Sequence, residues 1–353
     1  MQVRHHAAFT ALVAAALFGV TTPLAKALLG SLSPFMVAGL FYLGSGIGLA
    51  VGILVKRTRR TAGERQNESR IQVAEIPWLL GAIAAGGVVG PALLMLGLST
   101  TSAATSSLLL NLEGVLTAVI AWVVFRENVD LRIFLGMVAI VAGGVMLSWQ
   151  PGTASVSPGA LLVTGACAAW AIDNNLTRKV STNDAMVIAC LKGLVAGPVN
   201  LGIALMLGAH LPGAVGIATA MLTGFAGYGV SLVLFVVALR NLGTARTGAY
   251  FSVAPIFGVA LSIVLWPEMP SWRFGVAAAL MGVGIWFHIR ERHEHPHTHE
   301  ALDHNHRHRH DEHHQHVHDF EWDGEEPHTH PHRHAPITHA HAHFPDIHHR
   351  HVH

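Results

Sequence analysis

The chain has 353 residues, of which 51% are hydrophobic and 12% are charged, and its formal net charge is +1. Soluble domains have about 25% charged residues, so this composition excludes an ordinary soluble globular protein. The net charge averages two unlike parts, because 12 of the 21 Asp and Glu residues follow residue 290. Residues 1–290 therefore have the composition of a membrane protein.

Ten apolar runs are long enough to cross the hydrocarbon core of a bilayer, which takes about 20 residues. In chain order they occupy 8–29, 34–55, 76–98, 102–124, 131–149, 159–178, 184–208, 213–239, 244–265 and 272–290. The pattern predicts an all-α membrane protein with ten transmembrane helices.

Basic residues fall almost entirely on one side of these ten runs. Fifteen Lys and Arg residues lie on one side before the C-terminal tail is counted, and only Lys26 and Arg273 lie on the other. Loops rich in Lys and Arg remain in the cytoplasm. We expect a multi-pass protein of the bacterial inner (plasma) membrane, in contact with the lipid bilayer, with both termini in the cytoplasm.

The two halves of the apolar body resemble each other in sequence. The segment STTSAATSSLLLNLEGVLTAVIAWVVFRENVDLRIFLG (99–136) parallels RNLGTARTGAYFSVAPIFGVALSIVLWPEMPSWRFG (240–275), and AALFGVTTPLAK (15–26) faces CAAWAIDNNLTRK (167–179). With five helices in each copy, the second copy is inverted in the membrane relative to the first. Such repeats are typical of secondary transporters, which bind cargo near the bilayer midplane between the halves. We expect one five-helix repeat at 1–150, a second at 151–290 and a tail at 291–353.

The five-plus-five plan, the segment GLSTTSAATSSLLLNLEGVLTAVIAWVVFRE and its second copy resemble the EamA-type family of the drug/metabolite transporter superfamily, over about residues 8–290. The resemblance implies a ten-helix inverted-repeat transporter, with cargo anywhere from amino acids, sugars, nucleotide-sugars and amines to metals. Such proteins often have Glu-Pro in the fourth helix, where this chain has Glu113-Gly114, whereas the ninth helix keeps Ala254-Pro255. The stretches AWAIDNNLTRKVS and LFVVALRNLGTARTGAYFSVAP are similar to a bacterial subgroup of nickel/cobalt exporters with His-rich tails.

Three ionisable residues between 76 and 290 lie deep within predicted spans, namely Glu113, Asp173 and Lys192. A charge at the bilayer centre costs about 2.5–3.5 kcal/mol on the insertion scale, so such groups face a cavity or a partner. Asp173 and Lys192 lie near the same predicted face and could form a structural salt bridge. Glu113 then has no evident partner, and it either exchanges a proton for a cation or only stabilises a helix break.

Polar and aromatic residues complete the predicted transport site. Asn111, Asn174 and Asn175 add carbonyl oxygens near these charges, and Tyr228 and Tyr250 are candidates for an aromatic cavity wall. The candidate transport and substrate-binding residues are therefore Glu113, Asn111, Asp173, Asn174, Asn175, Lys192, Tyr228 and Tyr250.

The tail after residue 292 holds 23 of the 27 histidines. It has too little apolar surface for a core, which predicts a disordered segment. Neutral imidazole binds Zn, Cu, Ni and Co, and protonation competes with the metal. A compositional expansion with incidental affinity and a pH-sensitive polycation at the inner leaflet are the alternatives. The candidate metal ligands are His304, His306, His308, His310, His313, His314, His316, His318, His328, His330, His332 and His334.

Two transport hypotheses follow. The first is proton-coupled export of a divalent transition metal, with nickel and cobalt favoured and with a tail that collects or senses Ni, Co or Zn. The second is export of a small organic metabolite, an amino acid or drug-like compound, with a tail that only buffers metal. A membrane-anchored metal store is a third, non-transport alternative. We expect no tightly bound cofactor and no nucleic-acid partner. We also expect no enzyme activity, because neither a nucleophile–base pair nor a phosphate loop is evident. The sequence allows a homodimer but does not decide the oligomeric state.

Overall fold

The chain divides into two compact units, Met1–Arg290 and Glu291–His353, which we describe separately as the body and the tail. A computed structural model describes the following residues: 2–58, 72–125, 131–150, 155–177, 180, 184–242, 250–267 and 271–289 of the body, and 294–299, 302–308, 328–334 and 337–342 of the tail.

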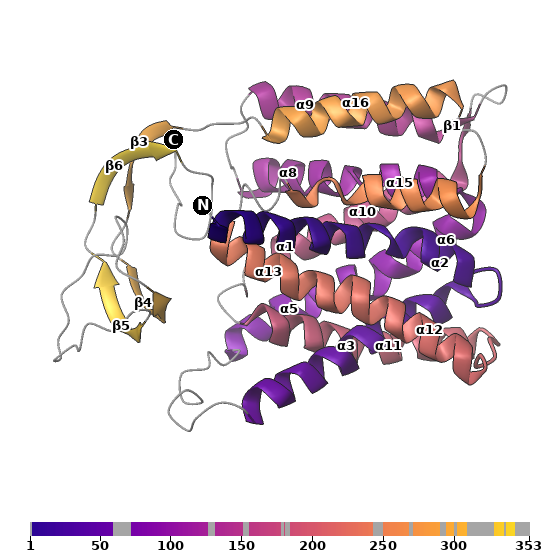
Figure 1. The fold of residues 1–353 in the computed structure, drawn as a ribbon, viewed down its shortest axis with the longest axis horizontal. Coiled ribbons are helices and arrows are strands. Elements are labelled where there is room, and N and C mark those ends of the chain that lie inside the picture. Colours follow the sequence, from indigo (N-terminus) through magenta and orange to yellow (C-terminus); the bar gives the residue numbers. More distant parts are fainter. Residues whose placement is uncertain are drawn as a thin grey trace. The chain divides into compact units, whose positions relative to one another are not determined.

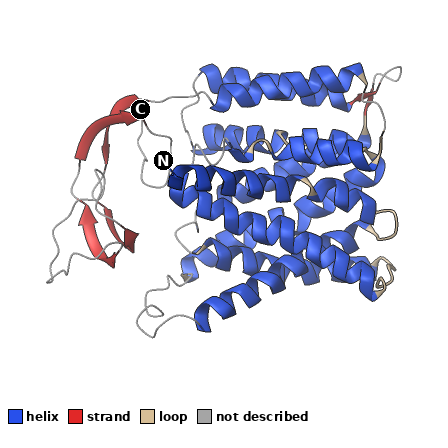
Figure 2. Ribbon diagram, in the orientation of Figure 1, coloured by secondary structure: helices blue, strands red, loops and turns tan. Residues whose placement is uncertain are grey.

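The first half of the described body is helical (Figures 1 and 2). Its elements are α1 (Gln2–Gly19), α2 (Thr21–Leu28), α3 (Pro34–Thr58), the 3-10 turn η1 (Val73–Glu75), α5 (Ile76–Ala82), the π-helix η2 (Ile83–Val89), α6 (Gly90–Thr100), α7 (Ala103–Leu109), α8 (Leu112–Phe125) and α9 (Leu131–Ser148).

The second half is also helical and follows a short antiparallel pair of strands, β1 (Trp149–Gln150) and β2 (Ser155–Val156). Its helices are α10 (Pro158–Thr177), α11 (Ala185–Met206), α12 (Ala214–Gly224), the π-helix η4 (Phe225–Val230), α13 (Ser231–Leu242), α15 (Ala254–Leu265) and α16 (Trp272–Ile289).

Each of the ten predicted spans contains described helix, and seven of the helices are long and apolar enough to cross a membrane. Ala254–Leu265 and Trp272–Phe287 are apolar but shorter. The body is therefore a helical protein with multiple apolar membrane-type helices, and ten crossings stay a prediction.

Glycines allow close packing between α3 and α11, which lie side by side in Figure 1. A Cβ atom on Gly193 would lie 2.5 Å from the Gly46 Cα, and one on Gly46 would lie 2.6 Å from the Leu194 nitrogen. Small residues let membrane helices approach to this distance. Gly44 packs equally closely against Met221, whereas a Cβ on Gly52 would meet no atom within 4 Å.

The π-helix η2 exposes backbone carbonyls that other helices satisfy. A π-turn shifts the bonding from the i−4 to the i−5 carbonyl and leaves a carbonyl without a helical donor. The Tyr42 hydroxyl and the Trp170 Nε1 both donate to the Gly86 carbonyl, at 2.7 and 2.9 Å, and the Asn200 amide donates to the Gly87 carbonyl at 3.0 Å. Three donors from α3, α10 and α11 thus stabilise the irregular turn.

The described parts of the tail form two separate two-stranded antiparallel sheets. Strand β3 (Glu294–His299) pairs with β6 (Ile337–Ala342), and β4 (Leu302–His308) pairs with β5 (His328–His334), in a register that sets His304 opposite His332. The composition predicts a disordered tail, and these four segments differ from that prediction. An alternation of His with other residues has the period of two that an extended strand also has.

Candidate functional site

A cavity of about 560 Å³ lies within the body, with walls from α1, α8, α10, α13 and α15. Four of the predicted residues line it together, namely Glu113, Asn111, Asn174 and Asn175. They come from two helices that are far apart in sequence, so the fold, and not sequence proximity, assembles this group.

A break between α7 and α8 places Glu113 at the cavity. Helix α7 ends at Leu109 and α8 begins at Leu112, so that Asn111 lies in the break and Glu113 lies in the first turn of α8. The first turn of a helix has N–H groups without helical partners, and its dipole favours a negative side chain. The corresponding helix of the second half begins at Ala254 with Pro255 in its first turn, where the missing N–H of proline costs nothing.

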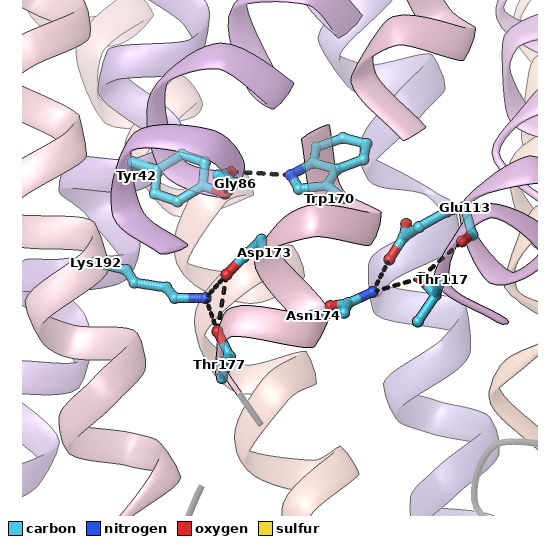
Figure 3. A network of polar contacts seen from close by, with 9 residues as sticks. All are labelled: Tyr42, Gly86, Glu113, Thr117, Trp170, Asp173, Asn174, Thr177 and Lys192. Carbon is cyan, nitrogen blue, oxygen red and sulfur yellow. Dashed lines mark hydrogen bonds and ion pairs between the residues drawn. The ribbon is translucent and has the colours of Figure 1, made fainter. Parts of the chain in front are cut away.

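Hydrogen bonds from α10 fix the Glu113 side chain (Figure 3). The Asn174 amide donates to the Glu113 Oε1 at 3.0 Å and to the Thr117 Oγ1 at 3.2 Å. Thr117 in turn donates to the Glu113 carbonyl at 2.8 Å, and the buried Asn175 donates to the Thr117 carbonyl at 3.3 Å. Among the described residues, none forms an ion pair with Glu113. Its carboxylate is therefore held by neutral donors and remains able to take a proton or a cation.

Three phenyl rings form another part of the cavity wall. Phe18, Phe235 and Phe251 all line it, with ring centroids 5.4 Å apart for Phe18 and Phe251 and 4.8 Å apart for Phe235 and Phe251. The faces of aromatic rings attract cations. The cavity thus combines one carboxylate, several amide and hydroxyl groups and a cluster of aromatic faces.

Asp173 and Lys192 form a separate polar cluster on the other side of α10 (Figure 3). The Lys192 Nζ lies 2.5 Å from the Asp173 Oδ1 and 2.9 Å from the Thr177 Oγ1, and Thr177 donates to Asp173 at 2.8 Å. The structure therefore brings this pair together, and neither residue lines the cavity.

The two predicted tyrosines lie elsewhere. Tyr228 belongs to η4, where its ring packs against Phe41 and Tyr42 with centroid distances of 5.8 and 5.4 Å. The ring of Tyr250 is exposed. Neither tyrosine lines the cavity, and its aromatic wall consists of phenylalanines instead.

The described part of the chain contains no group of three or more His, Cys, Asp and Glu side chains arranged to hold a metal ion. Seven of the predicted tail ligands lie on β4 and β5, where the structure describes the backbone; they are His304, His306, His308, His328, His330, His332 and His334. The other five, His310, His313, His314, His316 and His318, lie outside the described residues.

Sequence reasoning missed several residues of this cavity. Thr117 follows Glu113 by four residues, a spacing that places both side chains on one helix face and could have identified it. Phe18, Phe235 and Phe251 have no such signal, because a phenylalanine in an apolar helix is ordinary.

Comparison with known proteins places these features in a family. A family model described as the EamA-like transporter family matches residues 5–149 and again 157–290. An uncharacterized transporter of Methanothermobacter thermautotrophicus is 28% identical over 288 residues, which cover 76% of this chain and 81% of that protein. The uncharacterized transporter YyaM of Bacillus subtilis is 23% identical over 278 residues, covering 75% and 88%.

A solved structure supports the fold. One crystal structure superposes with a TM-score of 0.58 at 15% identity, and the match covers 79% of this chain and 94% of that one. At this identity the likeness concerns the fold alone. Because the family model matches both halves of the body, the chain belongs to the EamA-like transporter family.

Proposed function

We propose that the protein is a secondary transporter that binds a small organic cation in the cavity around Glu113 and exchanges it for protons. The observation that supports this most directly is the combination of one carboxylate without a cationic partner in the described body and three phenyl rings on one cavity of about 560 Å³. A carboxylate attracts an ammonium group, and aromatic faces add a cation–π contribution of about 0.5–2 kcal/mol.

Alternating access follows from an inverted repeat, and the helix contacts support one. Helix α3 contacts α11, and α9 contacts α16. The counterparts in the two halves are α1 and α10, α6 and α13, and α8 and α15. The contact of α10 with α6 thus corresponds to that of α1 with α13, and the contact of α10 with α8 corresponds to that of α1 with α15. The π-helices η2 and η4 occupy corresponding places in the two halves. We accordingly assign ten crossings to the body and place the cargo between its two halves. Both termini are assigned to the cytoplasm.

A proton coupling step needs only the Glu113 carboxylate. In the empty cavity Asn174 donates to one carboxylate oxygen, and a bound proton removes the remaining negative charge. An arriving cation and the proton then compete for the same carboxylate, so that loading on one side of the membrane releases the other species.

Export of a divalent transition metal is the second candidate, and the 23 histidines of the tail favour it. Nickel, cobalt and zinc bind well to imidazole and thiolate. Among the described residues, the lining of the cavity includes no His or Cys, and it offers carboxylate and amide oxygens. Such oxygen ligands suit weak, releasable binding of a metal that keeps part of its hydration shell.

The test uses the full chain in proteoliposomes with an imposed pH gradient. The probe is radiolabelled benzyltrimethylammonium, which has a fixed charge and an aromatic ring and so cannot cross the bilayer as a neutral base. We expect uptake driven by the gradient, loss of uptake in Glu113→Gln, and unchanged uptake in the matched control Glu75→Gln. Glu75 is half-buried, lies outside the cavity and caps η1, where Gln caps equally well.

A parallel sample contains a fluorescent nickel chelator inside the vesicles. If nickel enters in a Glu113-dependent way and benzyltrimethylammonium does not, the cargo is the metal and not an organic cation. Movement of neither probe would contradict both candidates.

A further inference from the structure

We infer that Asp173, Thr177 and Lys192 are positioning residues that fix helix α10 beside the cargo cavity, and that they act in only one of the two halves. The inference rests on the proposed function, because it assigns a control element to the same cavity. We call these three residues the α10 lock.

The α10 lock joins three elements of the body at a buried point. Asp173 is only 7% exposed, and its carboxylate accepts from Lys192 of α11 and from Thr177 one turn further along α10. A Cβ on Gly86 would overlap the same carboxylate, so Asp173 also packs directly on the π-helix η2. A buried ion pair is held firmly only when further hydrogen bonds satisfy both partners, and Thr177 supplies one to each.

One turn of α10 connects this lock to the cargo cavity (Figure 3). Successive residues of an α-helix are rotated by about 100°. Asp173 therefore faces α11 and η2, while the next residue, Asn174, faces the cavity and donates to Glu113 at 3.0 Å. Any shift of α10 that breaks the lock also moves the Asn174 amide away from the Glu113 carboxylate.

The matching positions of the first half have no charges. The alignment of 15–26 with 167–179 sets Thr21 at the position of Asp173, and Thr21 packs against Gly227 of η4 as Asp173 packs against Gly86 of η2. Gly46 and Gly193 meet where α3 crosses α11, so the preceding residues, Ser45 and Lys192, also correspond. A charged pair in one half thus corresponds to two neutral hydroxyls in the other.

Because only the second half has the charged pair, the α10 lock acts on the conformation of one half. In an inverted-repeat transporter, the two halves exchange conformations when the cavity changes the side to which it opens. An ion pair that exists in only one half stabilises one of the two arrangements and has no equivalent in the other. The α10 lock therefore sets which arrangement the empty protein prefers.

A native cysteine reports the position of α10 without any cargo. Cys167 lies on α10, is fully buried and contacts the Leu109 carbonyl at 3.5 Å, beside the break that places Glu113. In a Cys190→Ala background it is the only thiol of the chain. Its rate of alkylation by N-ethylmaleimide, measured on the full chain in proteoliposomes, therefore follows the displacement of α10.

We expect Asp173→Asn, which keeps the size of the side chain, to raise this rate about tenfold, within the range usual for coupled conformational equilibria. The double variant Asp173→Lys with Lys192→Asp should return the rate to within about twofold of the parent, because it restores the pair. Ser45→Ala is the control from the uncharged half, since Ser45 corresponds to Lys192 of the lock, and it should leave the rate unchanged.

A second readout separates positioning from a merely structural bridge. No hydrogen bond or ion pair joins Asp173 to Glu113 among the described contacts, so independent effects of Asp173→Asn and Glu113→Gln on the alkylation rate would multiply. We expect the alkylation rate of the Asp173→Asn, Glu113→Gln double variant to rise by clearly less than the product of the two single effects, because both changes release the same turn of α10.

An unchanged rate in Asp173→Asn, an equal rise in Ser45→Ala, or simple multiplication with Glu113→Gln would each overturn the inference. Because no cargo is present, these results do not depend on which cargo the protein carries. Failure of the uptake assay together with the expected alkylation pattern would contradict the proposed function and leave the lock intact.

Discussion

Substitution of Gly193 by alanine tests the close crossing of α3 and α11. The new Cβ would lie 2.5 Å from the Gly46 Cα and 2.6 Å from the Tyr42 carbonyl oxygen, whereas carbon atoms in contact prefer about 3.5–4.0 Å. The obstructing atoms belong to the backbone of α3, so α3 and α11 must separate by about 1 Å. Such overpacking costs about 1–3 kcal/mol.

Alanine also favours a helix over glycine by about 1 kcal/mol, so a matched control is needed. Gly202 lies on the same helix, α11, and a Cβ there would meet no atom within 4 Å. Gly202→Ala therefore has the gain in helix propensity without the clash. The difference in free energy of unfolding between the two variants isolates the clash, and we expect Gly193→Ala to be less stable than Gly202→Ala by about 1–3 kcal/mol.

The assay is thermal unfolding of the purified full chain in detergent, followed by the fluorescence of its eight tryptophans at one scan rate for all variants. The expected result is a melting temperature a few degrees lower for Gly193→Ala than for Gly202→Ala. Equal melting temperatures would show that α3 and α11 do not cross at these glycines, and would refute the packing described for the two halves.

Three further predictions concern η2 and the tail. Tyr42→Phe removes one of two donors to the Gly86 carbonyl and should lower the free energy of unfolding by about 0.5–1.5 kcal/mol, whereas Tyr250→Phe, on an exposed ring, should change it little in the same melting assay. Removal of residues 291–353 should leave the melting temperature of the body unchanged, because 1–290 is a compact unit by itself; a large decrease would contradict that division. In equilibrium dialysis, the full chain should bind more nickel than the shortened chain at pH 7.5, and most of the difference should vanish at pH 5.5. Imidazole has an ordinary pKa of about 6.5, and below it protons displace the metal, so a difference that persists at pH 5.5 would argue against histidine ligands.

Hydropathy located the helices of the body because membrane helices must be long and apolar. The predicted run 131–149 became α9, Leu131–Ser148, and 159–178 became α10, Pro158–Thr177. Interruptions inside the runs were not predicted from apolarity. The first run is split at Val20, between α1 and α2, and the third contains a π-helix. The π-helix is stabilised by donors from other helices, such as Trp170, which no local pattern contains.

The polar part of the cavity could be predicted because charges are rare in apolar spans. Glu113 is identified for this reason. Asn111, which is near it in sequence, and Asn174 and Asn175, which lie in the second half, also line the cavity. The aromatic part could not be predicted in the same way. Tyr228 and Tyr250 lie on late helices of the second half, but a place in the sequence does not give the direction of a side chain. Phe18, Phe235 and Phe251 reach the cavity only because α1, α13 and α15 converge there.

The composition of the cavity wall also limits what the tail can do for selectivity. Histidines in a separate unit can raise the local concentration of a metal, but they do not change which groups meet the cargo at Glu113. A soft metal gains most of its binding energy from imidazole or thiolate ligands, whereas the described lining of the cavity has carboxylate, amide and hydroxyl groups, phenyl rings and aliphatic side chains. An ammonium ion needs no such ligands, since one carboxylate and aromatic faces suffice. If the body nevertheless moves nickel, its affinity there must be low, and replacing Phe251 with leucine should then leave nickel transport intact. The same change should weaken transport of benzyltrimethylammonium, because the leucine side chain fills similar space without a π face.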